Sequence, residues 1–492
     1  MKYKLNENMP AKIIFINETE TALNATLRVN DKYETIIEVF DIPENLFDFH
    51  AQHTFERIVA QGKENSCFTI INALREKTTS FSGKSNYNMA LRSSIVIAGD
   101  SSVSSNECFR YFDIKVTDGV ELIGLCPYDF NEKWTDFHLN FYELTIPIDI
   151  RKIVANTKLG KWTFYVIPDS QFDKESLTLK FSPRIHFESE LPLPLEKLHS
   201  TLRKFTSFLE ILCGELVTIN ELTINSGENN KNYRSHDYVG FSNFPLDKLK
   251  LLNGNGNDST GYLRKAIFKL SDFEDISSSL NRWFDLFDSI LMAHGAYQRI
   301  LLDEDVGLLT ENKFLSAMQL VEGYASVDLD VANSREEFEI RKKKILNNVT
   351  EGKEFLEKCC TFSGITFLKQ LKAFTYESFC VLTGQSKSKF FEKHDKLIGA
   401  IKNDRDVYTH SSQSVSPQLD ILQLYDMASI FKDFYRINVL SRLGIKPELI
   451  CKRLFFSRKF HASMEKHFGV TLQNPEIVSS EFDSKMWLFS QQ

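Results

Sequence analysis

Several common catalytic motifs are missing from this sequence. Its eight cysteines form no C-x-x-C pair, and no histidine follows them at zinc-finger spacing, so no structural zinc site is expected. The phosphate loop G-x-x-x-x-G-K-[ST] is absent, as is the G-x-S-x-G turn. These absences argue against P-loop nucleotide hydrolysis and against serine hydrolysis of the α/β-hydrolase type. We therefore predict a protein that needs no metal and no cofactor.

Long hydrophobic runs are also missing. Residues 1–7 contain no apolar stretch like that of a secretory signal. Apolar runs such as residues 94–99 are far too short to span a bilayer. Cysteines in a chain of this length are expected to be reduced thiols. Together these features predict a cytoplasmic protein with no membrane segment.

The composition is that of a globular protein with room for two or three domains. Of its 492 residues, 42% are hydrophobic and 41 are Phe, enough for a large aromatic core. The net charge of −7 argues against nucleic acid as a partner of the whole chain. However, residues 311–460 hold 24 basic and 19 acidic residues, whereas residues 1–310 hold 33 and 43. A phosphate-backbone ligand is therefore expected to meet the later part of the chain.

Residues 1–190 have the pattern of an antiparallel β structure. Short β-branched and aromatic segments alternate with turns rich in Asn, Asp, Gly and Ser. The predicted strands cover residues 12–16, 25–29, 35–40, 110–116, 137–142 and 162–167. They predict a sandwich or barrel. A helix follows near 194–212, with Pro194 at its first position, and the polar stretch 223–260 is expected to be a loop.

From about residue 277 the hydrophobic period becomes helical. Ser279 is a plausible N-cap for the first helix. Further helices are expected around 314–322 and 341–344, from 355 onward, and over 374–382, 390–401 and 419–443. These segments predict an all-α bundle. The fold class is therefore α+β multidomain, with a β-rich N-terminal domain, accessory helices and a helical C-terminal domain.

The chemically most informative segment is residues 405–410, Arg-Asp-Val-Tyr-Thr-His. An arginine and a histidine that converge on one phosphate can supply what RNA cleavage needs. Arg405 would stabilise charge on the phosphorus oxygens, and His410 can move a proton near neutral pH. A spacing of five is not one helical face, so the motif is expected to straddle a helix end or turn, with the helix broken over 411–417.

Arg405 continues the apolar face of the preceding helix and should therefore need an anionic partner. Glu322 is a candidate partner for some cation of the bundle. Lys387, Lys389, Lys393 and Lys402 precede the motif and are predicted to bind RNA. By contrast, Arg341–Lys344 fit a solvated helix face, and His394 fits a core histidine.

The R-x4-H motif in a helical C-terminal domain, after a β-rich half, resembles the HEPN superfamily and in particular the ApeA-like anti-phage proteins. The resemblance implies a metal-independent endoribonuclease that acts in abortive infection and cleaves tRNA or other RNA. It implies a homodimer or higher even oligomer with two motifs facing each other, and a phage-encoded trigger. In the family the Arg and His are catalytic, which points to Arg405 and His410, with Asp406 in an orienting role.

The predicted domains are an ApeA-like sensing or regulatory domain (1–275), a helical connector (276–310), a HEPN domain (311–460) and a C-terminal tail (461–492). Three alternatives stay open. Arg405 could form a surface pair with Asp404 or Asp406, leaving His410 as a loop residue. The helices could form a non-catalytic HEPN module that binds nucleotides or a partner. The β-rich half could instead bind a ligand through an exposed aromatic platform at Trp134 or Trp162, dimerised by the helices.

Overall fold

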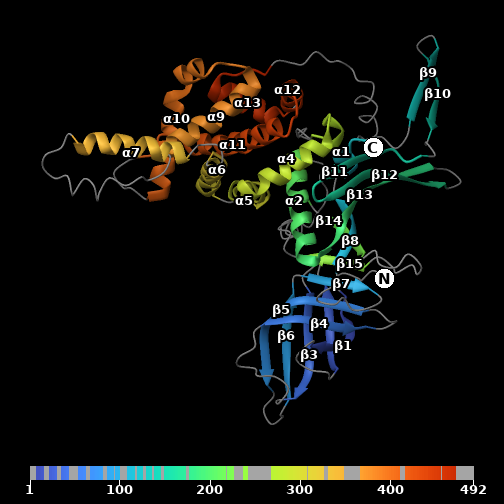
Figure 1. Ribbon diagram of the computed structural model, residues 1–492. Coiled ribbons are helices and arrows are strands. Elements are labelled where there is room, and N and C mark those ends of the chain that lie inside the picture. Colours follow the sequence, from blue (N-terminus) through green and yellow to red (C-terminus); the bar gives the residue numbers. More distant parts are fainter. Residues whose placement is uncertain are drawn as a thin grey trace. The chain divides into compact units, whose positions relative to one another are not determined.

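A computed structural model shows two compact units, one β-rich and one helical (Figure 1). The β-rich unit comprises Met1–Thr206 and Val217–Asn257, and the helical unit comprises Ser207–Leu216 and Asp258–Gln492. The structure describes residues 7–15, 22–29, 35–43, 54–62, 67–80, 86–93, 95–99, 108–116, 119–125, 129–135, 138–145, 149–172, 177–217, 219–225, 237–241, 268–306, 309–325, 331–347, 366–410, 416–455 and 457–472. The predicted fold class is confirmed: a barrel-like sheet domain and a helical C-terminal region.

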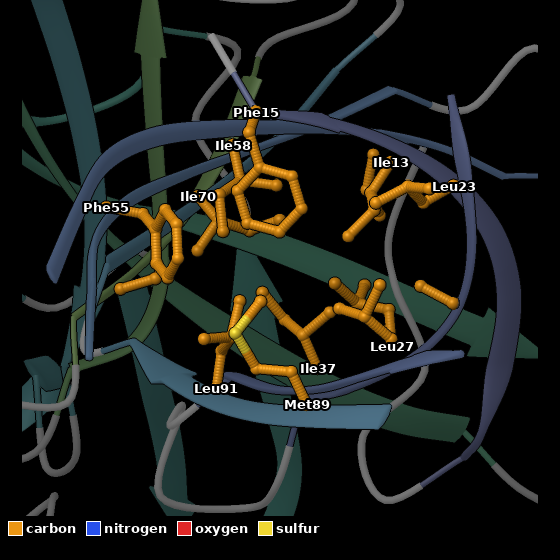
Figure 2. Close-up of a cluster of buried hydrophobic side chains, with 14 of the residues drawn as sticks. Ile13, Phe15, Leu23, Leu27, Ile37, Phe55, Ile58, Ile70, Met89 and Leu91 are labelled. Atoms are coloured by element: carbon orange, nitrogen blue, oxygen red, sulfur yellow. The ribbon is translucent and has the colours of Figure 1, made fainter. Parts of the chain in front are cut away.

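Six antiparallel strands close into a barrel. They are β1 (Met9–Phe15), β2 (Leu23–Val29), β3 (Thr35–Pro43), β4 (Thr54–Gln61), β5 (Cys67–Ser80) and β6 (Asn86–Ser93). Their order is β5-β4-β1-β2-β3-β6, and β6 pairs back onto β5. Every second side chain points inward, so Ile13, Phe15 and Leu27 fill the interior with no exposed surface (Figure 2).

Two residues of the barrel strands have a left-handed backbone, and one of them lies at a bulge. Asp41 in β3 has φ 55° and Asn72 in β5 has φ 53°, which a short polar side chain tolerates better than a bulky one. The register of β3 shifts between Val39 and Ile42, and the Asp41 backbone N–H donates to Asn88 Oδ1 at 3.1 Å. Bulges of this kind increase local twist and help a sheet close on itself.

The sheet continues beyond the barrel in the order β11-β12-β13-β8-β14-β15-β7, with β7 paired to β5. These strands are β7 (Ile95–Gly99), β8 (Cys108–Val116), β11 (Lys152–Thr157), β12 (Gly160–Phe172), β13 (Leu177–Pro194), β14 (Ile219–Asn225) and β15 (Asp237–Phe241). A short helix α1 (Gly119–Ile123) and a separate hairpin of β9 (Asp129–Thr135) and β10 (His138–Thr145) complete the described part of this unit. The stretch expected to be a loop over 223–260 thus contains β15 and the end of β14.

Trp162 lies at the centre of the aromatic core of the extended sheet. Its ring is fully buried and stacks on Phe205 with centroids 4.2 Å apart, while Phe112 makes an edge contact and Phe187 a tilted one. Phe205 comes from helix α2 (Leu195–Cys213), which begins one residue after the predicted start because Pro194 ends β13. Trp162 is therefore not an exposed platform, and the side chain of Trp134 lies outside the described residues.

The described helices of the second unit are α4 (Ile276–Ser289), α5 (Leu291–Val306), α6 (Thr310–Ala325), α7 (Val331–Asn347), α9 (Phe367–Thr383), α10 (Lys387–His410), α11 (Ile421–Arg442), α12 (Pro447–Phe455) and α13 (Arg458–Phe468), with a 3-10 turn at Leu270–Asp272. Helix α11 is buried along most of its length and packs against α5, α6, α9, α12 and α13. Helices α7 and α9–α11 match predicted ones. The helix expected from residue 355 lies outside the described residues, since these omit 348–365.

Two details of the helical unit differ from the prediction. The N-cap of α4 is Asp275, whose side chain accepts the Ser278 backbone N–H at 3.1 Å. Ser279 lies inside the helix and donates to the Leu443 carbonyl at 2.7 Å. The predicted tail from 461 begins within α13, where Phe468 is buried against Phe379. The predicted domain boundaries themselves stay predictions.

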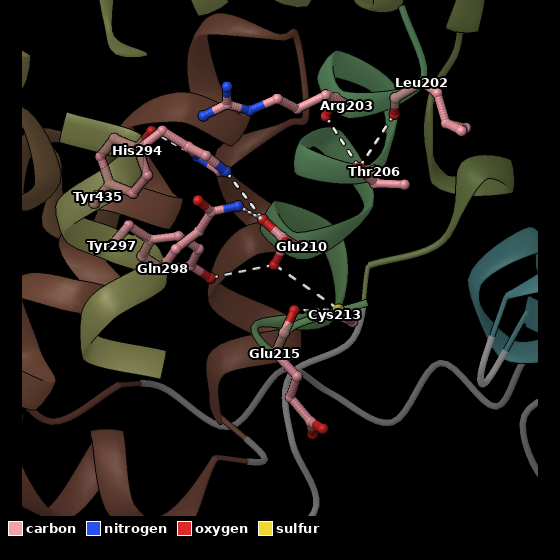
Figure 3. Close-up of polar contacts among 10 residues, drawn as sticks. All are labelled: Leu202, Arg203, Thr206, Glu210, Cys213, Glu215, His294, Tyr297, Gln298 and Tyr435. Atoms are coloured by element: carbon pink, nitrogen blue, oxygen red, sulfur yellow. Dashed lines mark hydrogen bonds and ion pairs between the residues drawn. The ribbon is translucent and has the colours of Figure 1, made fainter. Parts of the chain in front are cut away.

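A sealed polar cluster lies in the core of this unit (Figure 3). His294 binds the Glu210 carboxylate through Nε2 at 3.0 Å and Tyr435 Oη through Nδ1 at 3.2 Å. Gln298 donates to the same carboxylate at 2.9 Å, and the Tyr297 hydroxyl donates to the Glu210 carbonyl at 3.2 Å. We call these five residues the Glu210 cluster. Burial raises the pKa of both tyrosines well above the ordinary value, so both hydroxyls keep their protons.

Candidate functional site

Helix α10 carries the whole Arg405–His410 segment. Phe390, His394, Ile398 and Ile401 recur at helical spacing and are buried. The helix continues through His410, so the expectation that the motif straddles a helix end or turn is wrong. No residue between 405 and 410 breaks a helix, and the Thr409 hydroxyl donates to the Arg405 carbonyl one turn earlier at 2.7 Å.

The anionic partner expected for Arg405 is Glu322, on helix α6. Arg405 Nη2 lies 2.7 Å from Glu322 Oε1, and Nη1 lies 3.1 Å from Asp406 Oδ1. The guanidinium carbon sits 4.8 Å from the ring centroid of Phe367, at the start of α9, a distance typical of a cation–π contact. The Arg405 side chain is 19% exposed. Three helices thus hold this arginine at the edge of the bundle.

Asp406 links Arg405 to Lys402. Its second oxygen lies 2.7 Å from Lys402 Nζ, one turn back along α10. Partial burial raises the pKa of Asp406, but hydrogen bonds from Lys402 and Arg405 outweigh that effect and bring the pKa below its ordinary value. Asp406 is therefore ionised at neutral pH. We call Arg405, Asp406, Lys402, Glu322 and Phe367 the Arg405 cluster.

Asp404 has a structural contact of its own. It is fully buried and accepts the backbone N–H groups of Gln418 at 2.7 Å and Leu419 at 2.8 Å. These bonds hold the chain just before α11 against the end of α10. Among the described residues Asp404 does not pair with Arg405, so of the two surface pairs considered from sequence only Arg405–Asp406 forms.

Position 410 is the last residue of α10, and the His410 side chain lies outside the described residues. The backbone alone constrains the pair, because 3.6 residues make one helical turn. Positions 405 and 410 are then about 140° apart around the axis and about 7.5 Å apart along it. Within one copy the two positions do not share a helix face.

The predicted RNA-binding lysines are spread along the same helix. Lys387, Lys389 and Lys393 are exposed in its first two turns, which places them about 18–27 Å along the axis from Arg405. Around the helix axis Lys389 is about 160° and Lys393 about 120° from Arg405, whereas Lys387 lies on the same side as Arg405. Lys393 Nζ is also beside Gly469, the C-cap of α13, where the helix dipole favours a cation. These three lysines and Arg405 therefore lie too far apart to contact one phosphate group.

Sequence reasoning noted Glu322 without identifying its cation, and it missed Phe367 entirely. Glu322 comes 83 residues before Arg405, and neither residue stands in a recognisable motif. His394 is buried between the rings of Phe379, Phe390 and Phe468. Burial, and secondarily Lys393, lowers its pKa, so it is a neutral core histidine as predicted.

The described residues include no group of three or more His, Cys, Asp or Glu side chains arranged to hold a metal ion. Within the same residues, no helix has the length and apolar character needed to cross a membrane.

Arg341–Lys344 lie on α7, where Lys343 and Lys344 are exposed. That exposure is consistent with the solvated helix face predicted for these four residues.

Two family models match the chain. One is the ApeA N-terminal domain 1, over residues 12–283, and the other is the Apea-like HEPN domain, over residues 315–449. No curated protein and no solved structure matches. The second match includes Glu322, Phe367 and the whole Arg405–His410 segment.

The helical unit thus contains a HEPN domain, preceded by a β-rich domain of a defined type. The first match alone spans more than half of the 492 residues. The chain belongs to the ApeA family. Membership of this HEPN-containing family supports a nuclease or defence role at the family level.

Proposed function

We propose that the protein is a metal-independent endoribonuclease that acts in anti-phage defence by abortive infection, cleaving tRNA or other RNA. One observation carries the proposal. In a HEPN domain, Arg405 is held at the end of α10 by Glu322, Asp406 and Phe367, and a histidine follows five positions later. An arginine fixed in this way is suited to a phosphate, because its guanidinium is planar and always charged.

In the proposed reaction the 2′-hydroxyl of the substrate attacks the adjacent phosphorus. The new bond joins O2′ to phosphorus, and the bond from phosphorus to O5′ breaks. His410 accepts the 2′-hydroxyl proton or donates a proton to the leaving O5′, and solvent water takes part in the other of these two proton transfers. Arg405 stabilises the negative charge of the phosphorane, and Asp406 orients Arg405. The products carry 2′,3′-cyclic phosphate and 5′-hydroxyl ends.

The site is proposed to be completed by a second copy, in a homodimer or higher even oligomer. Positions 405 and 410 do not share a helix face in one copy. Exposed apolar side chains lie near the motif end of the bundle, at the starts of α6 and α11: Leu309, Ile421, Leu422 and Tyr425. Lys313 lies over the Tyr425 ring at 4.6 Å, which links these two helix starts. Burial of this surface would place two α10 ends close together.

The remaining assignments follow the family. The β-rich domain, proposed as residues 1–275, would sense a phage-encoded trigger, and residues 311–460 would form the HEPN domain after a connector. We place the protein in the cytoplasm. A non-catalytic HEPN module and a ligand-binding β-domain are the competing functions. The ligand-binding β-domain has lost one of its two candidate aromatic residues, because Trp162 is buried.

The test is to incubate the purified full-length protein with total tRNA in EDTA, beside His410→Ala. The proposal expects cleavage by the wild type only. Binding of tRNA without cleavage by either protein would favour the non-catalytic module. Neither binding nor cleavage, with a folded protein, would favour the β-domain function.

A further inference from the structure

Two arginines of the helical unit have the same kinds of partner, a glutamate and an aromatic ring. Arg442 uses Nε and Nη2 to bind both oxygens of Glu377, at 2.8 and 2.9 Å. Its guanidinium lies 4.6 Å from the Tyr324 ring centroid, and the Tyr324 hydroxyl also donates to Glu377 at 3.1 Å. This bidentate pair fills the matching edges of both groups, the strongest geometry for such a pair.

Arg405 is bound more loosely by its glutamate. Only Nη2 reaches Glu322, at a single oxygen, and the Glu322 side chain is 38% exposed. A guanidinium has five N–H donors, and the contacts with the described residues use one at Nη2 and one at Nη1. Because Glu322 makes only this single contact, its departure would open that edge of Arg405 to a phosphate.

The charges of the Arg405 cluster cancel. Arg405 and Lys402 contribute two positive charges, and Asp406 and Glu322 contribute two negative charges. A neutral cluster has no net attraction for a phosphate. Asp406 is shared with Lys402, which leaves Glu322 as the carboxylate whose departure would give the cluster a positive charge.

We propose that Glu322 competes with the RNA phosphate for Arg405 and keeps the resting site neutral until substrate displaces it. This inference rests on the proposed function, because it assumes that Arg405 binds an RNA phosphate. Glu322 comes from α6 and is fixed by the close packing of that helix. At the neighbouring Gly323, a Cβ atom would lie 2.8 Å from the Ala293 backbone nitrogen of α5, so α6 has little freedom to shift. Displacement is then a rotation of the Glu322 side chain rather than a movement of the helix.

The test measures tRNA affinity in a His410→Ala background, where the RNA is not cleaved. Glu322→Gln keeps the shape and the acceptor oxygen but removes the charge. We expect total tRNA to bind roughly threefold to tenfold more tightly, the effect of one partly exposed charge. The slope of log K against log salt should steepen by about 0.7, as for one more neutralised phosphate on a single strand.

Three further variants make the result specific. Glu377→Gln makes the same chemical change at the Arg442 pair and should leave tRNA affinity unchanged. Adding Arg405→Ala to Glu322→Gln should remove the gain. Glu322→Asp, one methylene shorter, keeps the charge and should give a smaller gain; it replaces Glu322→Gln if thermal melting shows that variant to be unfolded.

The outcomes separate the two proposals. If Arg405→Ala alone weakens tRNA binding but Glu322→Gln does not strengthen it, Glu322 only positions Arg405 and the inference is wrong. If Glu322→Gln still raises tRNA affinity in the Arg405→Ala variant, the gain comes from the change in net charge alone. That result would also overturn the inference. If Arg405→Ala leaves tRNA affinity unchanged, the phosphate role of Arg405 in the proposed function fails as well.

Discussion

The Glu210 cluster and the Arg405 cluster are both networks of charged and polar side chains in the helical unit, but they differ in their access to water. The side chains of Glu210 and His294 are each 2% exposed, whereas those of the Arg405 cluster reach 19–38%. Buried polar groups that satisfy one another specify how helices pack. Groups left half-exposed at a helix end contribute less to stability and can exchange partners. The difference suggests that one cluster holds the fold and the other meets a ligand.

The largest effect is expected from a substitution that breaks the Arg405 cluster. Arg405→Ala should lower the rate of RNA cleavage by roughly a hundredfold to a thousandfold, because a donor to the transition-state charge is lost. The free energy of unfolding should change little, since the pairs it loses are partly exposed. Single-turnover cleavage of tRNA and urea unfolding measure the two quantities. If Arg405→Ala strongly lowers the free energy of unfolding as well as the cleavage rate, the distinction between the two clusters fails.

The opposite pattern is expected for the Glu210 cluster. His294→Ala removes one of the two side-chain partners of the buried Glu210 carboxylate and leaves only Gln298 among those described, which should cost about 3 kcal/mol of unfolding free energy. Cleavage per folded molecule should stay close to that of the wild type. Urea unfolding, with activity corrected for the folded fraction, tests this. A loss below about 1 kcal/mol would show that the cluster is not a stabilising one.

A smaller effect is expected at the far end of α10. Replacing Lys387, Lys389 and Lys393 by Glu should weaken tRNA binding and reduce the salt slope by about 2, for three phosphates on a single strand. The rate of cleavage at saturating RNA should be unchanged, because these lysines lie about 18–27 Å from Arg405. Titrations at several salt concentrations provide the measurement. An unchanged slope would remove these lysines from the RNA path.

The smallest effect is a pH dependence at Asp406. Its pKa is lower in the folded protein than the ordinary value of 3.8, so its contribution to stability is complete above that value. The contribution is lost as the pH falls below 3.8 toward the folded pKa. Asp406→Asn should therefore lower the stability slightly near pH 7, and this difference from the wild type should shrink as the pH falls below 3.8. Thermal melting across pH 2.5–7 compares the two proteins, and a difference that stays constant or grows toward low pH would contradict the assignment.

The sequence predicted much of the fold, because hydrophobic period depends on local residues. The first three strands of the barrel, β1 to β3, and helices such as α9, α10 and α11 follow from it directly, whereas β4, β5 and β6 were not predicted. Closure of β6 onto β5 could not be predicted, since this pairing depends on register shifts such as those near Asp41 in β3 and between Arg75 and Lys77 in β5. The N-cap was placed at Ser279 instead of Asp275, because both residue types cap helices and local sequence does not choose between them.

The candidate site was predictable only in part. The Arg405–His410 spacing marked the position on the chain, and the apolar face of α10 correctly indicated that Arg405 needs an anion. The identity of that anion could not be predicted, because Glu322 approaches only once α6 packs against α10. The motif was expected to straddle a helix end or turn. This expectation was wrong because the helix-breaking residues begin only after His410.

The chemistry of the RNA ends tests the central claim most directly. The full-length protein would be incubated in EDTA with the RNA it cleaves and with the same RNA carrying one 2′-deoxy nucleotide at the cut site. The account predicts 2′,3′-cyclic phosphate and 5′-hydroxyl ends from the first RNA and no cut in the second. Products with 5′-phosphate ends that require magnesium, or a cut at the 2′-deoxy position, would contradict the roles assigned to Arg405 and His410.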